Sequence, residues 1–306
     1  MNSLTKLLIF LMAITFSARC SDGPEKFIPS PNALCSADPL PNKVAEAKKN
    51  VISIRAEFSP KDTDIKNGIP PDPIAAHGTA FMVEPGIIVS ARHVFMDTVV
   101  KLSQAFFPFI IGPDGLPEGI GYNYQFYGNA DFDGTAYLFP LRLIGMGQLG
   151  QHEDVMILKA EEYPSQLKQL DLGSISDKCE SLLSNFEKDI KKIKKECTVY
   201  SSGYVPMYSV YPDRFGIYQR ALSDIIRCEF KGTIVDISDN MPINKVGVIK
   251  RYRILTGYEQ GFSGGPLFNE DGQVIGMTIE GSREFTFAIS DQDIRKVLNK
   301  TKIETP

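Results

Sequence analysis

Ser263 stands in the string GFSGGPL, residues 261–267, where three glycines and a proline surround it. A serine hydroxyl is a poor nucleophile at neutral pH and needs a neighbouring base to take its proton. Histidine suits that task because its unperturbed pKa is about 6.5, and a carboxylate can hold its ring in one tautomer. The chain has three histidines, His77, His93 and His152, and all of them precede Ser263. The string therefore predicts either a nucleophile on a shaped loop or an ordinary glycine-rich turn.

Residues 261–265 also match G-x-S-x-G, the nucleophile elbow of α/β-hydrolases. Those enzymes carry serine, acid and histidine in that order along the chain, and their elbow opens a helix. No histidine follows Ser263, and residues 266–279 instead read as a hairpin around the turn 269–272. We therefore reject the α/β-hydrolase interpretation.

The order histidine, aspartate, serine is met. His93 follows an apolar stretch in GTAFMVEPGIIVSARHVF (78–95), Asp154 heads the apolar stretch in HEDVMILKA (152–160), and GFSGGP comes last. Together these strings resemble the trypsin-like (chymotrypsin-fold) serine peptidases, most closely the bacterial secreted or HtrA-like branch. The resemblance covers roughly residues 50–300, with firm motifs at these three places. It implies an all-β fold of two antiparallel six-stranded barrels, with the site in the cleft between them.

The resemblance implies a role for each motif residue in a serine endopeptidase. His93 is expected to be the general base and acid, Asp154 the orienting carboxylate and Ser263 the nucleophile that forms an acyl-enzyme. The backbone N–H groups of Gly261 and Ser263 are expected to form the oxyanion hole, because glycine permits the backbone conformation that this needs. The partner is a protein or peptide substrate, and no cofactor or metal is expected.

Two alternatives stay open. An aspartate at a strand start is often only a turn former, so Glu153, Asp131 and Asp133 compete with Asp154. The other alternative is a non-catalytic protein-binding module on the same fold. His77 and His152 lack the context of His93 and are interpreted as surface or supporting groups.

The family pattern also implies which residues line the primary substrate pocket. The residue six positions before the serine lies at the base of the primary pocket in this family, and here it is Gly257. Without an acid at that position, we expect a neutral, apolar side chain before the scissile bond. Glu259 or Glu280 reaching the pocket would favour a basic side chain instead. The wall strand is expected to contribute Thr278, Ile279, Glu280 and Gly281.

Two departures from the family pattern limit what can be transferred. In vertebrate digestive trypsins an aspartate precedes the catalytic serine and receives the new N-terminus on activation, whereas this chain has Phe262. That trigger therefore cannot operate here. Degradative HtrA-like proteins usually carry PDZ domains, but only about 25 residues follow the last motif, too few for such a domain.

The surrounding elements are predicted from short, β-branched and aromatic runs punctuated by glycine and proline. We expect an N-terminal barrel over residues 47–160, a connector over 161–196, and a C-terminal barrel with a closing helix over 197–306. Strands are expected at 51–58, 79–85, 86–95, 123–128, 135–147, 154–160, 197–205, 214–230, 231–238, 246–257, 266–268, 273–279 and 285–290. Within the connector, residues 177–196 place apolar side chains on one face and predict an amphipathic helix.

The N-terminus predicts export. Residues 1–20 pair Lys6 with a short apolar run, the layout of a secretory signal peptide. Cleavage after Ser17 and cleavage after Cys20 both satisfy the small-residue rule, and a lipid anchor at Cys20 is a third possibility that Arg19 disfavours. Residues 21–46, with five prolines, are predicted to be an extended leader. We expect a secreted or periplasmic protein without a membrane span.

Composition and cysteines agree with this. The chain has 306 residues, is 43% hydrophobic and has a net charge of −4, which argues against nucleic acid as a partner. An oxidising compartment favours disulfides among the cysteines beyond the signal, but their pairing is left open. If residues 179–196 form one helix, its ends lie about 27 Å apart, which excludes a Cys179–Cys197 disulfide. The four cysteines are Cys35, Cys179, Cys197 and Cys228.

Overall fold

The computed structural model describes most of the chain between residues 39 and 304. The described ranges are 39–60, 74–105, 110–111, 117–118, 122–148, 153–184, 189–212, 218–240, 249–258, 260–282 and 284–304. The predicted signal peptide, Cys20, Cys35, His152 and Glu259 lie outside these ranges. Within them, every helix is too short or too polar to cross a bilayer.

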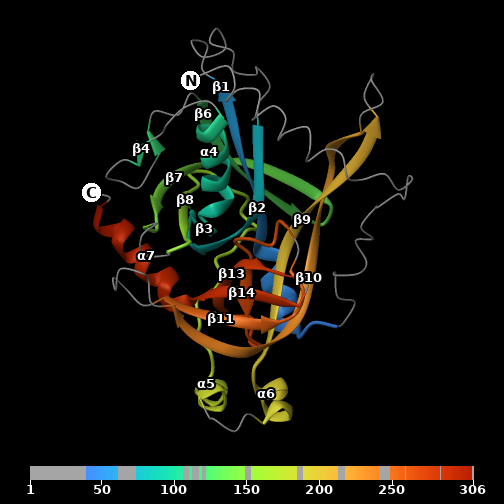
Figure 1. The fold of residues 1–306 in the computed structure, drawn as a ribbon, viewed down its shortest axis with the longest axis vertical. Helices are drawn as coiled ribbons and strands as arrows, with labels where there is room; N and C mark the ends of the chain where they lie inside the picture. Colours follow the sequence, from blue (N-terminus) through green and yellow to red (C-terminus); the bar gives the residue numbers. More distant parts are fainter. Residues whose placement is uncertain are drawn as a thin grey trace, which may run out of the picture. The chain divides into compact units, whose positions relative to one another are not determined.

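Two closed, antiparallel, six-stranded barrels make up the fold, as the sequence predicts (Figure 1). Pairing of the first and last strands closes each barrel, β1 with β6 and β10 with β9. The first barrel runs β1 (Val51–Pro60), β2 (Ile74–Glu84), β3 (Ile87–Ser90), β8 (Met156–Lys159), β7 (Thr135–Met146) and β6 (Tyr122–Phe132). The second runs β10 (Tyr218–Asn240), β11 (Ile249–Leu255), β14 (Phe285–Ser290), β13 (Val274–Gly281), β12 (Pro266–Phe268) and β9 (Thr198–Pro212).

Burial along the strands explains why these segments form barrels. In β7, buried Phe139, Leu141 and Leu143 alternate with more exposed neighbours, as expected for a strand with one face on the core. One apolar cluster contains residues from both barrels, including Met82 of β2 and Met277 of β13. The two barrels therefore share buried surface, and the residues between them are held on packed elements.

One predicted strand is wrong in its second half. The segment 86–95 is a strand only through Ser90, and α4 (His93–Ala105) begins three residues later. The N–H of Met96 donates to the Arg92 carbonyl, and Val94 and Phe95 are buried on the helix. The apolar run continued past the strand because this helix also packs on the core. Two other predicted strands, 214–230 and 231–238, are continuous from residue 218 onward as the single strand β10, which pairs with β9 and then with β11. Residues 214–217 lie outside the described ranges.

The connector helix is also corrected. Residues 177–196 do not form one helix, because α5 (Asp177–Ser184) and α6 (Ile190–Glu196) are separate (Figure 1). Asp189 caps the start of α6 by accepting hydrogen bonds from two backbone N–H groups. The break brings Cys179 and Cys197 together, with Cα atoms 5.1 Å apart, and they form a disulfide. The sequence argument against this disulfide assumed one continuous helix between the two cysteines, and it does not apply to two separate helices.

The remaining elements tie the ends of the chain to the barrels. The predicted closing helix is α7 (Asp291–Glu304), which contacts β7 of the first barrel as well as β13 of the second. A short helix, α2, leads through one 3-10 turn into β1, and β4 pairs with β5. Their bounds are α2 (Asn42–Ala47), η2 (Lys48–Asn50), β4 (Ile110–Ile111) and β5 (Pro117–Glu118).

Candidate active site

Ser263 lies on a tight loop that leads into β12. Gly261 and Gly264, on either side of it, have φ angles of 103° and 87°, values that side chains with a Cβ rarely adopt. A Cβ on Gly264 would also lie 2.1 Å from the Thr79 carbonyl oxygen of β2. A Cβ on Gly261 would lie 2.2 Å from the Tyr204 carbonyl oxygen of β9. Both positions therefore require glycine for their backbone conformation, and Gly264 also for the close approach of the first barrel. The Ser263 side chain itself is only 7% exposed.

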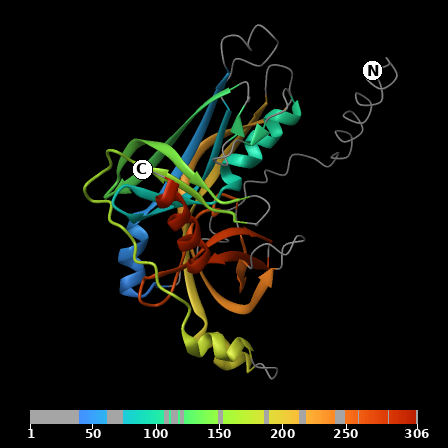
Figure 2. The ribbon, with the colours of Figure 1, turned by 90° about the vertical axis from the view of Figure 1, so that its left-hand side faces the viewer.

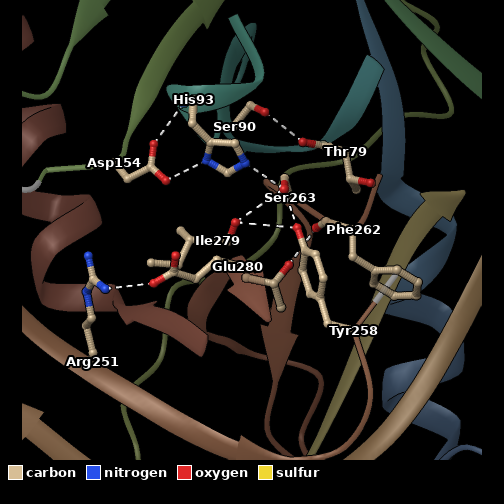
Figure 3. A network of polar contacts seen from close by, with 11 residues as sticks. Thr79, Ser90, His93, Asp154, Arg251, Tyr258, Phe262, Ser263, Ile279 and Glu280 are labelled. Atoms are coloured by element: carbon tan, nitrogen blue, oxygen red, sulfur yellow. Dashed lines mark hydrogen bonds and ion pairs between the residues drawn. The ribbon is translucent and has the colours of Figure 1, made fainter. Parts of the chain in front are cut away.

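His93 lies at the start of α4 and connects Asp154 to Ser263 (Figure 3). Its Nδ1 lies 2.6 Å from Asp154 Oδ2, and its Nε2 lies 2.7 Å from Ser263 Oγ. The backbone N–H of His93 donates to the other carboxylate oxygen of Asp154 at 2.9 Å. The Asp154 carboxylate is therefore hydrogen-bonded to both the ring and the backbone N–H of His93, and this fixes the orientation of the imidazole.

The electrostatics of this pair favour an ionised acid and a basic imidazole. Burial raises the pKa of Asp154, but the hydrogen bonds and charge of His93, with Arg92 nearby, outweigh it and hold that pKa below its usual value. Burial lowers the pKa of His93, but the hydrogen bond and charge of Asp154 outweigh it, and Asp97 and Glu280 add to the rise. The net pKa of the imidazole is raised.

The other carboxylates and histidine weighed from sequence lie elsewhere. The Glu153 side chain is fully buried and pairs with Lys296 and Lys300 of α7 rather than with His93. Asp131 accepts a hydrogen bond from the Gly134 N–H in the turn between β6 and β7, which Asp133 shares. His77 lies in β2, and burial and then Arg55 lower its pKa to about 4.

Thr79 is a residue that the sequence analysis missed. Its Oγ1 donates to the Gly261 carbonyl at 2.7 Å and accepts from the Tyr204 N–H at 2.8 Å. Its backbone N–H donates to the Ser263 carbonyl at 2.9 Å. One residue of the first barrel thereby clamps the serine loop of the second. Thr79 stands in β2 directly before the apolar residues 80–83, and nothing local in the sequence marks its role.

The residues expected to form the primary pocket do not all face one space. Thr278 is fully buried, and its Oγ1 donates to the Phe262 carbonyl at 2.6 Å. The Gly257 carbonyl accepts from Thr286 Oγ1. In contrast, Glu280 and Gly281 line a hollow of about 420 Å³ that also borders His93. Glu280 forms an ion pair with Arg251 at its edge, with a 2.9 Å separation (Figure 3).

Tyr258 is the second residue that the sequence analysis missed. Its hydroxyl is in hydrogen-bond contact with Ser263 Oγ, and it lies 3.4 Å from the Ile279 carbonyl oxygen. Figure 3 shows the ring rising from below toward the serine, on the side opposite His93. Burial raises the pKa of this phenol to about 12, although hydrogen bonds from the Ser263 side chain and backbone act in the opposite direction.

Phe262 takes the position before the serine and anchors the loop by packing. It is 2% exposed, and its ring centroid lies 5.3 Å from that of Phe230. A Cβ on Gly203 would lie 2.7 Å from the Phe262 ring, so β9 makes room for it. Apolar burial therefore holds the residue next to Ser263.

Comparisons with known proteins bear on the family and the fold of this chain. The family model of the trypsin-like peptidase domain matches residues 78–277. Among curated proteins, no sequence match is found. An inactive form of Rv3671c from M. tuberculosis H37Rv has a similar structure, with a TM-score of 0.51 at 18% identity, covering 89% of this chain and 98% of that chain. At 18% identity, this likeness to Rv3671c concerns the fold alone.

Two other solved structures are matched at lower TM-scores. Deg5 is 16% identical with a TM-score of 0.49, and the alignment covers 83% of this chain and 90% of Deg5. The HtrA-type protease AlgW, solved with a decapeptide, is 15% identical with a TM-score of 0.47, covering 86% of this chain and 67% of that chain.

Proposed function

Because the chain belongs to the trypsin-like peptidase family, we propose that it is a serine endopeptidase that cuts peptide bonds through an acyl-enzyme. One observation carries the proposal. The unbroken chain of contacts from Asp154 through His93 to Ser263 spans both barrels and ends on a serine in a glycine-shaped loop. A serine that served only as a turn residue would not require a histidine and a carboxylate as partners.

The proposed reaction uses these groups in sequence. His93 Nε2 takes the proton from Ser263 Oγ as the oxygen attacks the carbonyl carbon of the scissile bond, and Asp154 stabilises the imidazolium that forms. The backbone N–H groups of Gly261 and Ser263 receive the oxyanion. His93 then protonates the leaving amine, the C–N bond breaks, and an acyl-Ser263 ester remains. Water, activated by the same histidine, hydrolyses that ester and restores the serine.

We also propose a location and a substrate preference for the enzyme. The signal-like residues 1–20 support a secreted or periplasmic enzyme. The Gly257 position and the ion-paired state of Glu280 support an uncharged side chain before the scissile bond, because neither presents a free carboxylate to a basic residue.

The direct test compares the wild-type protein with Ser263→Ala on an internally quenched peptide library. We expect the variant to lose about 10⁴–10⁶-fold in kcat, as happens when the nucleophile of a serine peptidase is removed. Glu161→Gln, which changes an exposed carboxylate of the first barrel, is the matched control and should keep full activity. Equal rates for Ser263→Ala and wild type would overturn the assignment.

One observation favours a second candidate, a protein-binding module without activity. The Tyr258 hydroxyl contacts the oxygen that would attack the substrate. Labelling with a fluorophosphonate probe separates the two functions, because the probe reacts only with an activated serine. A folded protein that forms no adduct at Ser263 under any condition would favour the binding module.

A further inference from the structure

Tyr258 is held in place by contacts at both its backbone and its ring. Its N–H donates to the Ser282 carbonyl at 2.9 Å, just beyond the end of β13. The ring packs on a small apolar cluster that contains Phe230 and Phe262. A Cβ on Gly281 would lie 2.3 Å from Tyr258 Cβ and 2.6 Å from its Cγ, so the absence of a side chain there makes room for the ring.

This position coincides with the space that a peptide substrate needs. The reacting carbonyl carbon must come within about 3–3.5 Å of the serine oxygen, and its oxygen must reach the backbone N–H groups of the oxyanion hole. The Tyr258 hydroxyl contacts Ser263 Oγ and lies 3.4 Å from the Ile279 carbonyl oxygen. The Tyr258 phenol and the carbonyl group of a substrate cannot both lie against Ser263 Oγ at the same time.

We propose that Tyr258 is the gate of the primary pocket: in the conformation seen here it closes the site, and a substrate must displace its ring before Ser263 can react. This inference rests on the proposed peptidase function. Displacement joins the space of the ring to the adjacent hollow of about 420 Å³, which Ile279, Glu280 and Gly281 border. Tyr258 also decides specificity, because only side chains able to replace an aromatic ring gain the full pocket.

The gate differs from the trypsinogen switch. That switch acts on the residue before the serine, which in this chain is buried Phe262. Tyr258 lies five positions before the serine, with Gly257 preceding it in the same loop. In the proposed opening, the Tyr258 side chain rotates away from Ser263, while the loop around Ser263 keeps the hydrogen bonds that Thr79 makes to it.

The test uses two variants of the full chain. Tyr258→Ala removes the gate, and Tyr258→Phe removes only the hydroxyl that contacts Ser263. We expect Tyr258→Ala to react with a fluorophosphonate probe at least about tenfold faster than wild type. Its kcat/KM for peptides with Phe before the scissile bond should also rise at least about tenfold relative to peptides with Ala there. Tyr258→Phe should label as fast as wild type or faster.

Controls separate the ways in which this proposal can fail. Ser263→Ala gives the labelling background, and Tyr200→Phe removes a buried tyrosine hydroxyl outside the site and should match wild type. Wild type and Tyr258→Ala labelling at the same rate would overturn the gate while keeping the peptidase. A tenfold slower Tyr258→Phe would also overturn it, by assigning the hydroxyl to oxyanion binding. If no variant labels Ser263, the peptidase proposal itself falls.

Discussion

His93 carries the pH dependence of the proposed reaction. The ring must be neutral to accept the serine proton, and the structure raises its pKa through Asp154, with Asp97 and Glu280 contributing. Activity should therefore be lost as the pH falls through a value above 6.5, the ordinary pKa of histidine. The plateau lies on the alkaline side.

Substitution of Asp97 tests this at the level of one charge. Asp97→Asn removes a carboxylate that raises the His93 pKa without contacting the serine, so the acidic limb of kcat/KM against pH should move to lower pH. Asp271→Asn, an exposed carboxylate in the turn after β12, should leave the profile unchanged. An acidic limb that does not move in Asp97→Asn would contradict the electrostatic argument.

Thr79 supports a second prediction at the residue scale. Thr79→Val leaves the Gly261 carbonyl and the Tyr204 N–H without the partner they now share, which should cost about 1–3 kcal/mol in free energy of unfolding. Because the serine loop loses its clamp, kcat should fall about tenfold or more while KM changes little.

The matched control for Thr79 is the conservative variant. Thr79→Ser keeps the hydroxyl and removes only a methyl group, so it should recover most of the lost kcat. Stability alone would not produce that pattern, since assays run well below the melting temperature of both variants. If Val and Ser behave alike, Thr79 is a packing residue rather than a positioning residue.

At the scale of elements, the α5–α6 pair depends on a covalent link as well as on packing. Cys179 and Cys197 are both buried in the cluster that contains Ile254 and Leu267 of the second barrel. Their separation of 18 residues gives a loop whose closure is worth about 3 kcal/mol in the chain-entropy account. The disulfide therefore compensates for the break between two short helices.

Replacing both cysteines with alanine should lower the free energy of unfolding by about 2–4 kcal/mol, measured by urea denaturation. Mutation is preferable to reduction because Cys228 is also disulfide-bonded. Peptidase activity below the unfolding transition should be retained, since α5 and α6 lie away from α4 and the site (Figure 2). An unchanged unfolding midpoint would show that the disulfide adds nothing to the packing.

In the molecule as a whole, α7 links the two barrels. Lys296 and Lys300 reach back from the end of the second barrel to Glu153 of the first, with N–O distances of 2.9 Å. Glu153 directly precedes Asp154, and its carboxylate also accepts a hydrogen bond from the Gln148 N–H. The closing helix thus supports the loop that carries the proposed orienting acid.

Glu153→Gln should lower stability by about 1–3 kcal/mol, because two ammonium groups lose a buried anionic acceptor. Burial raises the pKa of Glu153, but its hydrogen bonds with Lys300 and Lys296 outweigh this, and the net pKa is lowered. The stabilisation is therefore fully present above pH 4.5, the ordinary value, and is lost as the pH falls through the lowered pKa.

Thermal unfolding of wild type and Glu153→Gln across this pH range tests the prediction. The difference between them should be largest at neutral pH and should shrink in acid. Glu161→Gln, which breaks the exposed contacts with Lys159 and Arg142, should show no such difference. A gap between Glu153→Gln and wild type that is constant with pH would point to packing instead of charge.

The family and the barrel architecture could be predicted from the amino-acid sequence alone. The order of His93, Asp154 and Ser263 is readable because each stands beside a local pattern, a strand end or a glycine loop. Closing helix α7 was found by the same kind of local signal. The helix that begins at His93 was not predicted. The apolar run of the strand before it continues into the buried start of this helix, so the composition does not change where the strand ends and the helix begins.

The contacts between groups that lie far apart in the sequence could be found only from the folded structure. Thr79 and Gly261 are 182 residues apart, and Lys300 and Glu153 are 147 apart, so nothing local marks either pair. The break between α5 and α6, where Asp189 caps the second helix, permits a disulfide that one continuous helix would prevent. Tyr258 is close to Ser263 in sequence, but whether a side chain faces the serine or the solvent depends on the packing of Gly281 and Phe262 around it. Contacts made across a fold depend on geometry that no short stretch of sequence contains.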